Sequence, residues 1–136
     1  MFWIGTNTGL SCFDGNSLVQ TTQGWKKAKE LTENDEIFTH QRKATPIVKI
    51  GKFKTSNQLH VIKKGSIGRN LPFKDMIISE GHKIIVKGKW TYPRDFAPEY
   101  KPKQPVELYH IKTSNYETDT LVVNGMILEI WKDGMP

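Results

Sequence analysis

The sequence contains only one cysteine, Cys12, among its 136 residues. One cysteine cannot form an internal disulfide, and it excludes the structural zinc sites that need several cysteine ligands. A lone thiol is also kept reduced more easily inside the cell. No apolar run approaches the roughly 20 residues of a membrane-spanning helix. Residues 1–5 lack the basic start and the length of a signal peptide. We therefore expect an intracellular protein with no membrane partner and no cofactor.

Acidic residues are fewer than basic ones, 14 against 20, so the net charge is +6. Basic charge can serve nucleic-acid binding, but the lysine clusters are separated along the chain and carry no interleaved aromatic residues. A solvated basic surface is the simpler explanation. We expect no nucleic-acid partner. A basic nucleic-acid-binding β-domain is the weakest hypothesis, because it depends on charge alone.

Long helical patterns are absent as well. Short segments of alternating polar and apolar residues, punctuated by eleven glycines and seven prolines, predict strands and turns instead. The best helical candidate is the short segment 25–31, and the four prolines between 93 and 105 predict an irregular loop. Such a pattern favours an all-β fold. The predicted strands cover residues 17–22, 36–39, 46–53, 59–62, 75–78, 83–86, 106–112 and 120–131.

Cys12 and a distant Ser79-x-x-His82 together suggest chemistry on the chain itself. The sulfur of a cysteine can reach the carbonyl carbon of the residue before it, here Ser11, and convert that amide into a thioester. His82 on its turn is the candidate acid that protonates the leaving nitrogen, and Ser79 could orient the carbonyl or the imidazole. Taken alone, a lone cysteine is more often a small buried residue, and such a histidine a packed one.

Several other residues have a structural explanation beside a chemical one. Asp75 could be a base for the attacking nucleophile, although a turn residue is the favoured reading. Asn124-Gly125 is typical of a tight type I′ turn between two strands. The remaining expectations are tryptophans in the core or in cleft walls, and histidines on exposed strand faces: Trp25, Trp90 and Trp131, and His40 and His60.

Five short motifs, in this order, carry a resemblance to a known family: residues 12–24, 28–37, 75–82, 109–111 and 121–129. The chain resembles the Hint domain family, which includes hedgehog autoprocessing domains and inteins, and it is most similar to bacterial and phage members that do not splice. The resemblance implies an all-β Hint fold, a flattened horseshoe with pseudo-twofold symmetry and neighbouring chain ends. It also implies that Cys12 is the nucleophile, and that His82 and Asn124 could meet it.

Departures from the family pattern narrow the implied reaction. Glu129 stands where splicing inteins have a penultimate histidine, and Ile130 where they have the asparagine that cyclises. His110 stands where inteins often have aspartate, and it could be a second acid–base group or a packed strand histidine. The resemblance therefore implies an N-to-S acyl shift and thioester cleavage between Ser11 and Cys12, without asparagine cyclisation. Sterol transfer is not expected, since few residues follow Glu129.

Two domain segments follow from this reading: an upstream flank, 1–11, and a Hint domain, 12–136. The substrate is then the chain's own upstream polypeptide, and water or an external nucleophile completes the cleavage. Release of eleven residues is an odd product. Either a longer segment precedes residue 1 in nature, or the fold is kept as a structural or interaction module, as in a phage or viral assembly. The expected location is cytoplasmic or virion-associated.

Overall fold

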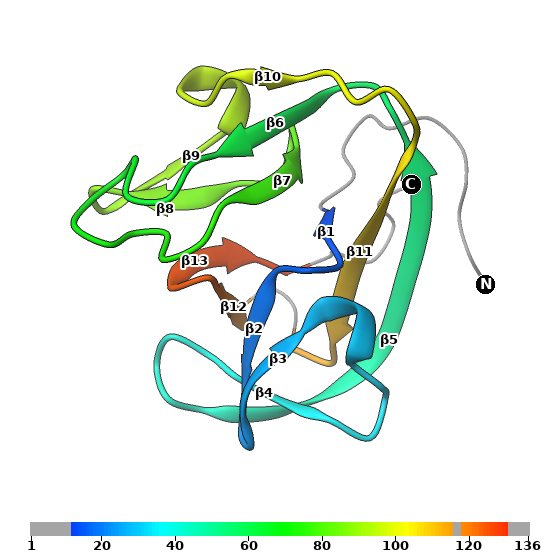
Figure 1. Ribbon diagram of the computed structural model, residues 1–136. Coiled ribbons are helices and arrows are strands. Elements are labelled where there is room, and N and C mark those ends of the chain that lie inside the picture. Colours follow the sequence, from blue (N-terminus) through cyan, green and yellow to red (C-terminus); the bar gives the residue numbers. More distant parts are fainter. Residues whose placement is uncertain (1–11, 116–117, 131–136) are drawn as a thin grey trace.

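The computed structural model describes residues 12–115 and 118–130, and nearly all of its regular structure is β (Figure 1). Within these ranges the only helical elements are two three-residue 3₁₀ turns, η1 Ala28–Glu30 and η2 Pro93–Asp95, so no described helix is long and apolar enough to cross a membrane. The strands are β1 Phe13–Asp14, β2 Leu18–Thr21, β3 Gly24–Lys27, β4 Glu36–Phe38, β5 Ala44–Thr55, β6 Leu59–Ile62, β7 Met76–Ser79, β8 Ile84–Val86, β9 Lys89–Thr91, β10 Glu99–Tyr100, β11 Val106–Thr113, β12 Thr120–Val123 and β13 Met126–Glu129.

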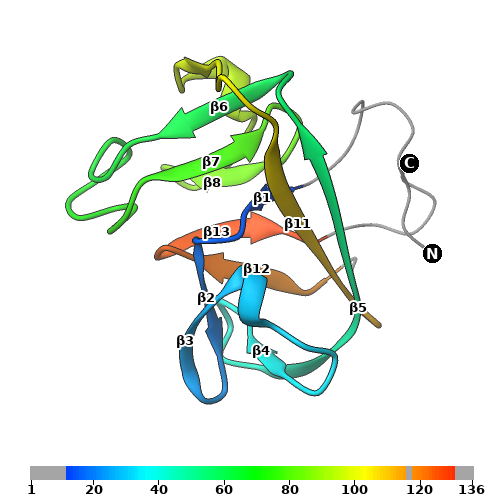
Figure 2. The ribbon, with the colours of Figure 1, turned by 45° about the vertical axis from the view of Figure 1, so that its right-hand side comes forward.

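The strands form one antiparallel path that curls on itself. Its order is β10-β6-β7-β1-β11-β5-β4-β2-β12-β13-β8-β9, with β3 added beside β2. Figures 1 and 2 show β5 and β11 as long arms that connect the group around β6 and β7 to the group around β2 and β4. This curled sheet confirms the expected all-β, horseshoe-like fold.

The core follows from the alternation of side chains along the strands. Val19 and Thr21 of β2 are buried, while their neighbours Leu18 and Gln20 are partly exposed. The largest buried cluster lies inside the curl and draws apolar residues from almost every strand. A smaller cluster contains Cys12, which packs with residues of β5, β6 and β11: Phe53, Leu59 and Leu108. The curl of the sheet therefore buries the cysteine.

The predicted helix over residues 25–31 is wrong in its first half. Residues 24–27 form β3, which makes a hairpin with β2, and only η1 follows. The hairpin turn has Gly24 at φ 106°, and the Thr21 hydroxyl donates to the Gly24 carbonyl at 2.7 Å. Because pairing with β2 uses the main-chain groups of this segment, a helix cannot form there.

Two further expectations were wrong, one for the proline-rich segment and one for His60. The proline-rich segment 93–105 is not wholly irregular, since it contains η2 and β10, and β10 pairs with β6. His60 of β6 is buried rather than on an exposed face, and its Nδ1 lies 2.9 Å from the carbonyl oxygen of Ala97, which lies between η2 and β10. His40 is exposed as expected, but it lies in a turn.

The two tryptophans in the described part of the chain do not build the core. Trp25 is 44% exposed and Trp90 49% exposed, on strands at the margins of the sheet. Trp25 meets only the edge of Phe73, with ring centroids 4.9 Å apart. A core position was therefore the wrong expectation for these two residues, the cleft-wall alternative stays a prediction, and Trp131 lies outside the described residues.

Candidate active site around Cys12

The register of four neighbouring strands places the candidate residues in one row. Phe13 of β1 pairs with Ile78 of β7 on one side and with Tyr109 of β11 on the other. Cys12, one residue earlier, therefore lies between Ser79 and His110, because antiparallel neighbours advance in opposite directions. His110 in turn pairs with Gly51 of β5. We call Ser79, Cys12, His110 and Gly51 the cross-sheet row.

Directly opposed residues in antiparallel strands place their side chains on the same face of the sheet. Cys12 and Ser79 show this contact directly. The Ser79 N–H donates to the Cys12 carbonyl at 2.9 Å, and the Cys12 N–H donates to the Ser79 hydroxyl oxygen at 3.1 Å. The sequence predicted a contact of Ser79 with a carbonyl or an imidazole. The hydrogen bond described here goes to the nitrogen that would leave in a cleavage before Cys12.

His82 reaches the same place from the turn that follows β7. Its N–H donates to the Ser79 carbonyl at 3.2 Å, which closes the turn. Its ring is buried, and Nε2 lies 2.8 Å from the main-chain carbonyl oxygen of Glu129. A carbonyl oxygen can only accept, so Nε2 carries a proton. The neutral ring then has its lone pair on Nδ1, which is buried and has no partner in hydrogen-bond geometry among the described residues, although the Cys12 main chain lies near enough to favour the protonated ring.

Burial keeps both the His82 ring and the Cys12 thiol uncharged. It lowers the pKa of His82, although the Glu129 carboxylate, the Glu129 main chain and the Cys12 main chain favour the protonated ring and oppose the shift. Burial also raises the pKa of the Cys12 thiol well above its ordinary value. At neutral pH the site therefore holds a thiol and a neutral imidazole, and the cysteine needs a base before it can act as a nucleophile.

His110 is the second imidazole of the site. It is buried, and burial lowers its pKa to about 4, with further lowering from the positive charges of His82 and Lys49. The two rings are thus close enough to influence each other's protonation. The His110 ring lies against the main chain of Gly51, and a methyl group added to Gly51 would overlap this ring. The structure therefore brings together all four candidate residues of the described chain, and Ser11 lies outside the described residues.

Asn124 does not join this site. Its side-chain oxygen accepts from the Leu18 N–H at 2.9 Å, and its amide donates to the Lys74 carbonyl at 3.3 Å. Asn124 and Gly125 have φ values of 52° and 89°, as the predicted type I′ turn requires. The expectation that Asn124 could meet Cys12 is wrong, because the turn uses both ends of its side chain.

Asp75 directly precedes β7 and has a structural role, but it does not cap Phe73-Lys74 as expected; its carboxylate instead holds the turn at Lys63 and Lys64. Its carboxylate accepts from the Lys64 N–H at 2.7 Å and lies 3.5 Å from the Lys63 ammonium. The side chain is half exposed on the surface. It is therefore fully occupied at a β-turn rather than poised beside Cys12.

Two residues of the site were not predicted from the sequence. Glu129 bonds to the turn of His82 in three ways, since its carboxylate also accepts from the Lys83 N–H at 2.9 Å and its N–H donates to the Lys83 carbonyl at 3.2 Å. Gly51 completes the cross-sheet row. Gly51 belongs to none of the five motifs, and Glu129 ends one of them without a predicted contact, because both residues act through strand pairing between distant segments.

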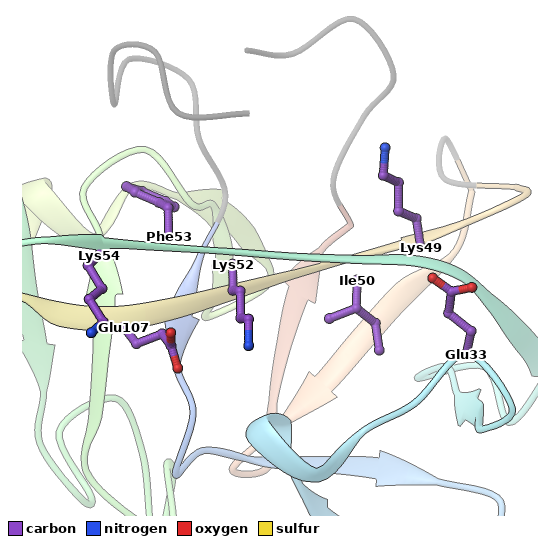
Figure 3. Close-up of a pocket in the computed structure, with 7 residues that line it drawn as sticks. All are labelled: Glu33, Lys49, Ile50, Lys52, Phe53, Lys54 and Glu107. Atoms are coloured by element: carbon purple, nitrogen blue, oxygen red, sulfur yellow. The ribbon is translucent and has the colours of Figure 1, made fainter. Parts of the chain in front are cut away.

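A cleft of about 520 Å³ lies on another part of the long arms (Figure 3). None of the candidate residues lines it. No described group of three or more histidine, cysteine, aspartate or glutamate side chains could hold a metal ion. The candidate residues therefore lie outside the lining of the cleft, although Phe53 both lines it and packs in the cluster of Cys12. The cleft is lined by Glu33, Lys49, Ile50, Lys52, Phe53, Lys54 and Glu107.

The fold is similar to those of solved inteins and intein-like domains. A bacterial intein-like domain from Clostridium thermocellum matches with a TM-score of 0.69 and 11% identity, over 88% of this chain and 99% of that one. A DnaB intein from Synechocystis matches with a TM-score of 0.63 and 14% identity, over 90% and 100%. The gp41-1 intein matches with a TM-score of 0.62 and 16% identity, over 90% and 99%.

At such identities these structures show the shared fold alone. No curated protein matches the sequence. The family comparison is more direct, because the Hint domain family matches residues 11–94, which is more than half of the chain and includes Cys12, Ser79 and His82. Together with the curled sheet and the site at its centre, this match shows that the chain belongs to the Hint domain family.

Proposed function

We propose that this Hint domain cleaves its own chain between Ser11 and Cys12. The observation that carries the proposal is the environment of the Cys12 nitrogen. The Ser79 hydroxyl accepts its N–H at 3.1 Å, and the His82 ring is held beside the Cys12 main chain by the Glu129 carbonyl. The nitrogen that must leave as an amine thus has a hydrogen-bonding group on it, and a proton carrier lies near the main chain of the same residue.

The protonation states suggest how the first step proceeds. The buried Cys12 thiol keeps its proton, so attack requires a base, and Nδ1 of neutral His82 is the available lone pair. The sulfur attacks the Ser11 carbonyl carbon while its proton passes to Nδ1. The C–N bond then breaks, and the same proton passes from Nδ1 to the Cys12 nitrogen. The product is a thioester between the Ser11 carbonyl and the Cys12 sulfur, with a free amine on Cys12.

A second nucleophile completes the reaction. Water or an added thiol attacks the thioester carbonyl, and the Cys12 sulfur leaves and takes up the proton that the nucleophile loses. The upstream polypeptide is released as a carboxylic acid or as a new thioester. The domain retains Cys12 as its first residue, so each molecule reacts once.

Cleavage at the other end by asparagine cyclisation is not part of the proposal. Ile130 occupies the position after Glu129, where the reaction would need an asparagine side-chain amide, and its own side chain is buried and apolar. The Glu129 carboxylate already accepts the Lys83 N–H. This end of the chain therefore supports His82 instead of supplying a reacting group.

Intact mass after thiol treatment tests the function. A stable partner is fused upstream of Met1, and dithiothreitol is added to the purified fusion. We expect release of the partner with residues up to Ser11, and no release from Cys12→Ala. His82→Ala should slow release by about 10²- to 10⁴-fold, the usual contribution of a positioned acid–base group. His40→Ala, at an exposed histidine, is the matched control and should cleave like the wild type.

One observation favours a second function. Cys12 is fully buried and its thiol has a raised pKa, which is also how an unreactive structural cysteine is placed. The alternative is a Hint fold kept as a structural or interaction module. A fusion that stays intact with thiol at every pH between 5 and 9, while remaining folded, would support this alternative and contradict self-cleavage.

A further inference from the structure

Gly51 ends the cross-sheet row on the side opposite Ser79. It is buried in the middle of β5, a strand in which a glycine contributes no side chain to packing. A Cβ atom built at this position would lie 1.7 Å from Nε2 of His110 and 2.3 Å from its Cδ2. These distances are far below any permitted contact, so the His110 ring occupies the space that a side chain at residue 51 would fill.

The direction in which Gly51 faces on β5 shows on which side of the sheet this space lies. Figure 3 shows Lys49 and Phe53 pointing to one side of β5, and Ile50 and Lys52 to the other. Side chains alternate along a strand, so Gly51 shares its face with Lys49 and Phe53. Phe53 packs in the same cluster as Cys12. The space above Gly51 therefore lies on the face of β5 that also carries Phe53, which packs with the reacting cysteine.

We propose that Gly51 is a positioning residue for the self-cleavage reaction, because its missing side chain lets the His110 imidazole lie across β5 in a fixed place beside Cys12. The inference rests on the proposed function. Gly51 touches no reacting atom and acts through His110. The ring that it admits belongs to the residue directly opposite Cys12, so a shift of that ring changes the surroundings of the sulfur.

The charged and titratable groups that influence the His110 ring lie on several strands. Lys49 of β5 and His82 from the turn after β7 both act on His110 electrostatically. Cys12 precedes β1, and Glu129 of β13 acts on His82. A displaced His110 ring changes its interaction with His82, the proposed base. We therefore expect the pH dependence of cleavage, as well as its rate, to change.

A double-mutant cycle on the upstream fusion tests this inference. The cleavage rate is measured between pH 5 and 9 for the wild type, Gly51→Ala, His110→Ala and the double variant. We expect Gly51→Ala to slow cleavage by about 10- to 100-fold, as displacement of a site group by about 1 Å does. In the His110→Ala background the ring is gone, so Gly51→Ala should change the rate by no more than about twofold.

Gly68→Ala is the matched control, because its Cβ would meet only Leu71, at an ordinary 3.5 Å. It should cleave like the wild type. An equal loss from Gly51→Ala with and without His110, or no loss at all, would overturn the inference while leaving self-cleavage intact. Absence of cleavage in the wild type would overturn the proposed function and this inference together.

A second variant covers the case in which Gly51→Ala does not fold. His110→Phe keeps an aromatic ring over Gly51 but removes both ring nitrogens. It should fold, cleave more slowly than the wild type and show a changed pH profile. A His110→Phe fusion with the rate and pH profile of the wild type would overturn the inference, because the placement of that imidazole would then be irrelevant to the reaction.

Discussion

Glu129 influences His82 through its main chain and through its charge. The carbonyl accepts from Nε2 and so fixes which nitrogen carries the lone pair, while the carboxylate favours the protonated ring. The main-chain bond survives any substitution of the side chain. The negative charge is lost when the side chain is changed. It can be removed while a side-chain oxygen that accepts from the Lys83 N–H is kept.

Glu129→Gln should therefore shift the acid limb of the cleavage profile to lower pH. Loss of the negative charge lowers the pKa of His82 further, so the neutral base persists in more acidic solution. Cleavage rates of the upstream fusion between pH 4 and 8 measure the shift. Glu99→Gln, an exposed residue of β10, is the control and should leave the profile unchanged. A shift of the limb to higher pH would contradict the electrostatic role of Glu129.

His110 should make the folded protein sensitive to acid. Its pKa is about 4 in the folded state and about 6.5 when unfolded, so the unfolded chain binds more protons between these values. The folded state therefore loses stability as pH falls from about 6.5 to about 4, by up to about 3 kcal/mol from this residue. Denaturant unfolding at pH 7 and pH 4.5 should show a smaller loss for His110→Phe. His82 contributes in the same direction, so some loss remains.

At the scale of elements, the turn between β12 and β13 is held by the side chain of Asn124. This buried amide bonds to the main chain of Leu18 and of Lys74, and so connects three separate segments. Asn124→Ala leaves a buried N–H without a partner, which costs about 1–3 kcal/mol. We expect this loss in denaturant unfolding, with cleavage of the folded fraction unchanged. Asn34→Ala, in an exposed turn, should be nearly neutral.

Elements with a strong local pattern were predicted from the sequence. The strand over residues 59–62 was predicted with the bounds it has, and Asn124-Gly125 correctly indicated a turn between two strands. The helix predicted over residues 25–31 was wrong because pairing with β2 overrode a weak helical preference. His60 was wrongly expected on an exposed face because its ring contacts Ala97, in the proline-rich segment 93–105 that was expected to be an irregular surface loop.

At the scale of the whole molecule, the site depends on the order of the strands. Cys12, Ser79 and His82 could be found from the sequence, because their motifs occur in a recognisable order. Glu129 and Gly51 could not be found, since their roles depend on which strands become neighbours in the curled sheet. The sequence thus indicated the candidate residues, and the structure was needed for the residues that contact them.

The hydrogen bond between His82 and Glu129 also affects when cleavage can begin during protein synthesis. During translation Cys12 and His82 leave the ribosome first, but the carbonyl that orients the imidazole belongs to the last described strand. A nascent fusion should therefore keep its passenger until synthesis has gone past residue 129. Ribosome-bound chains arrested before that codon should remain whole, and chains arrested well beyond it should release the passenger.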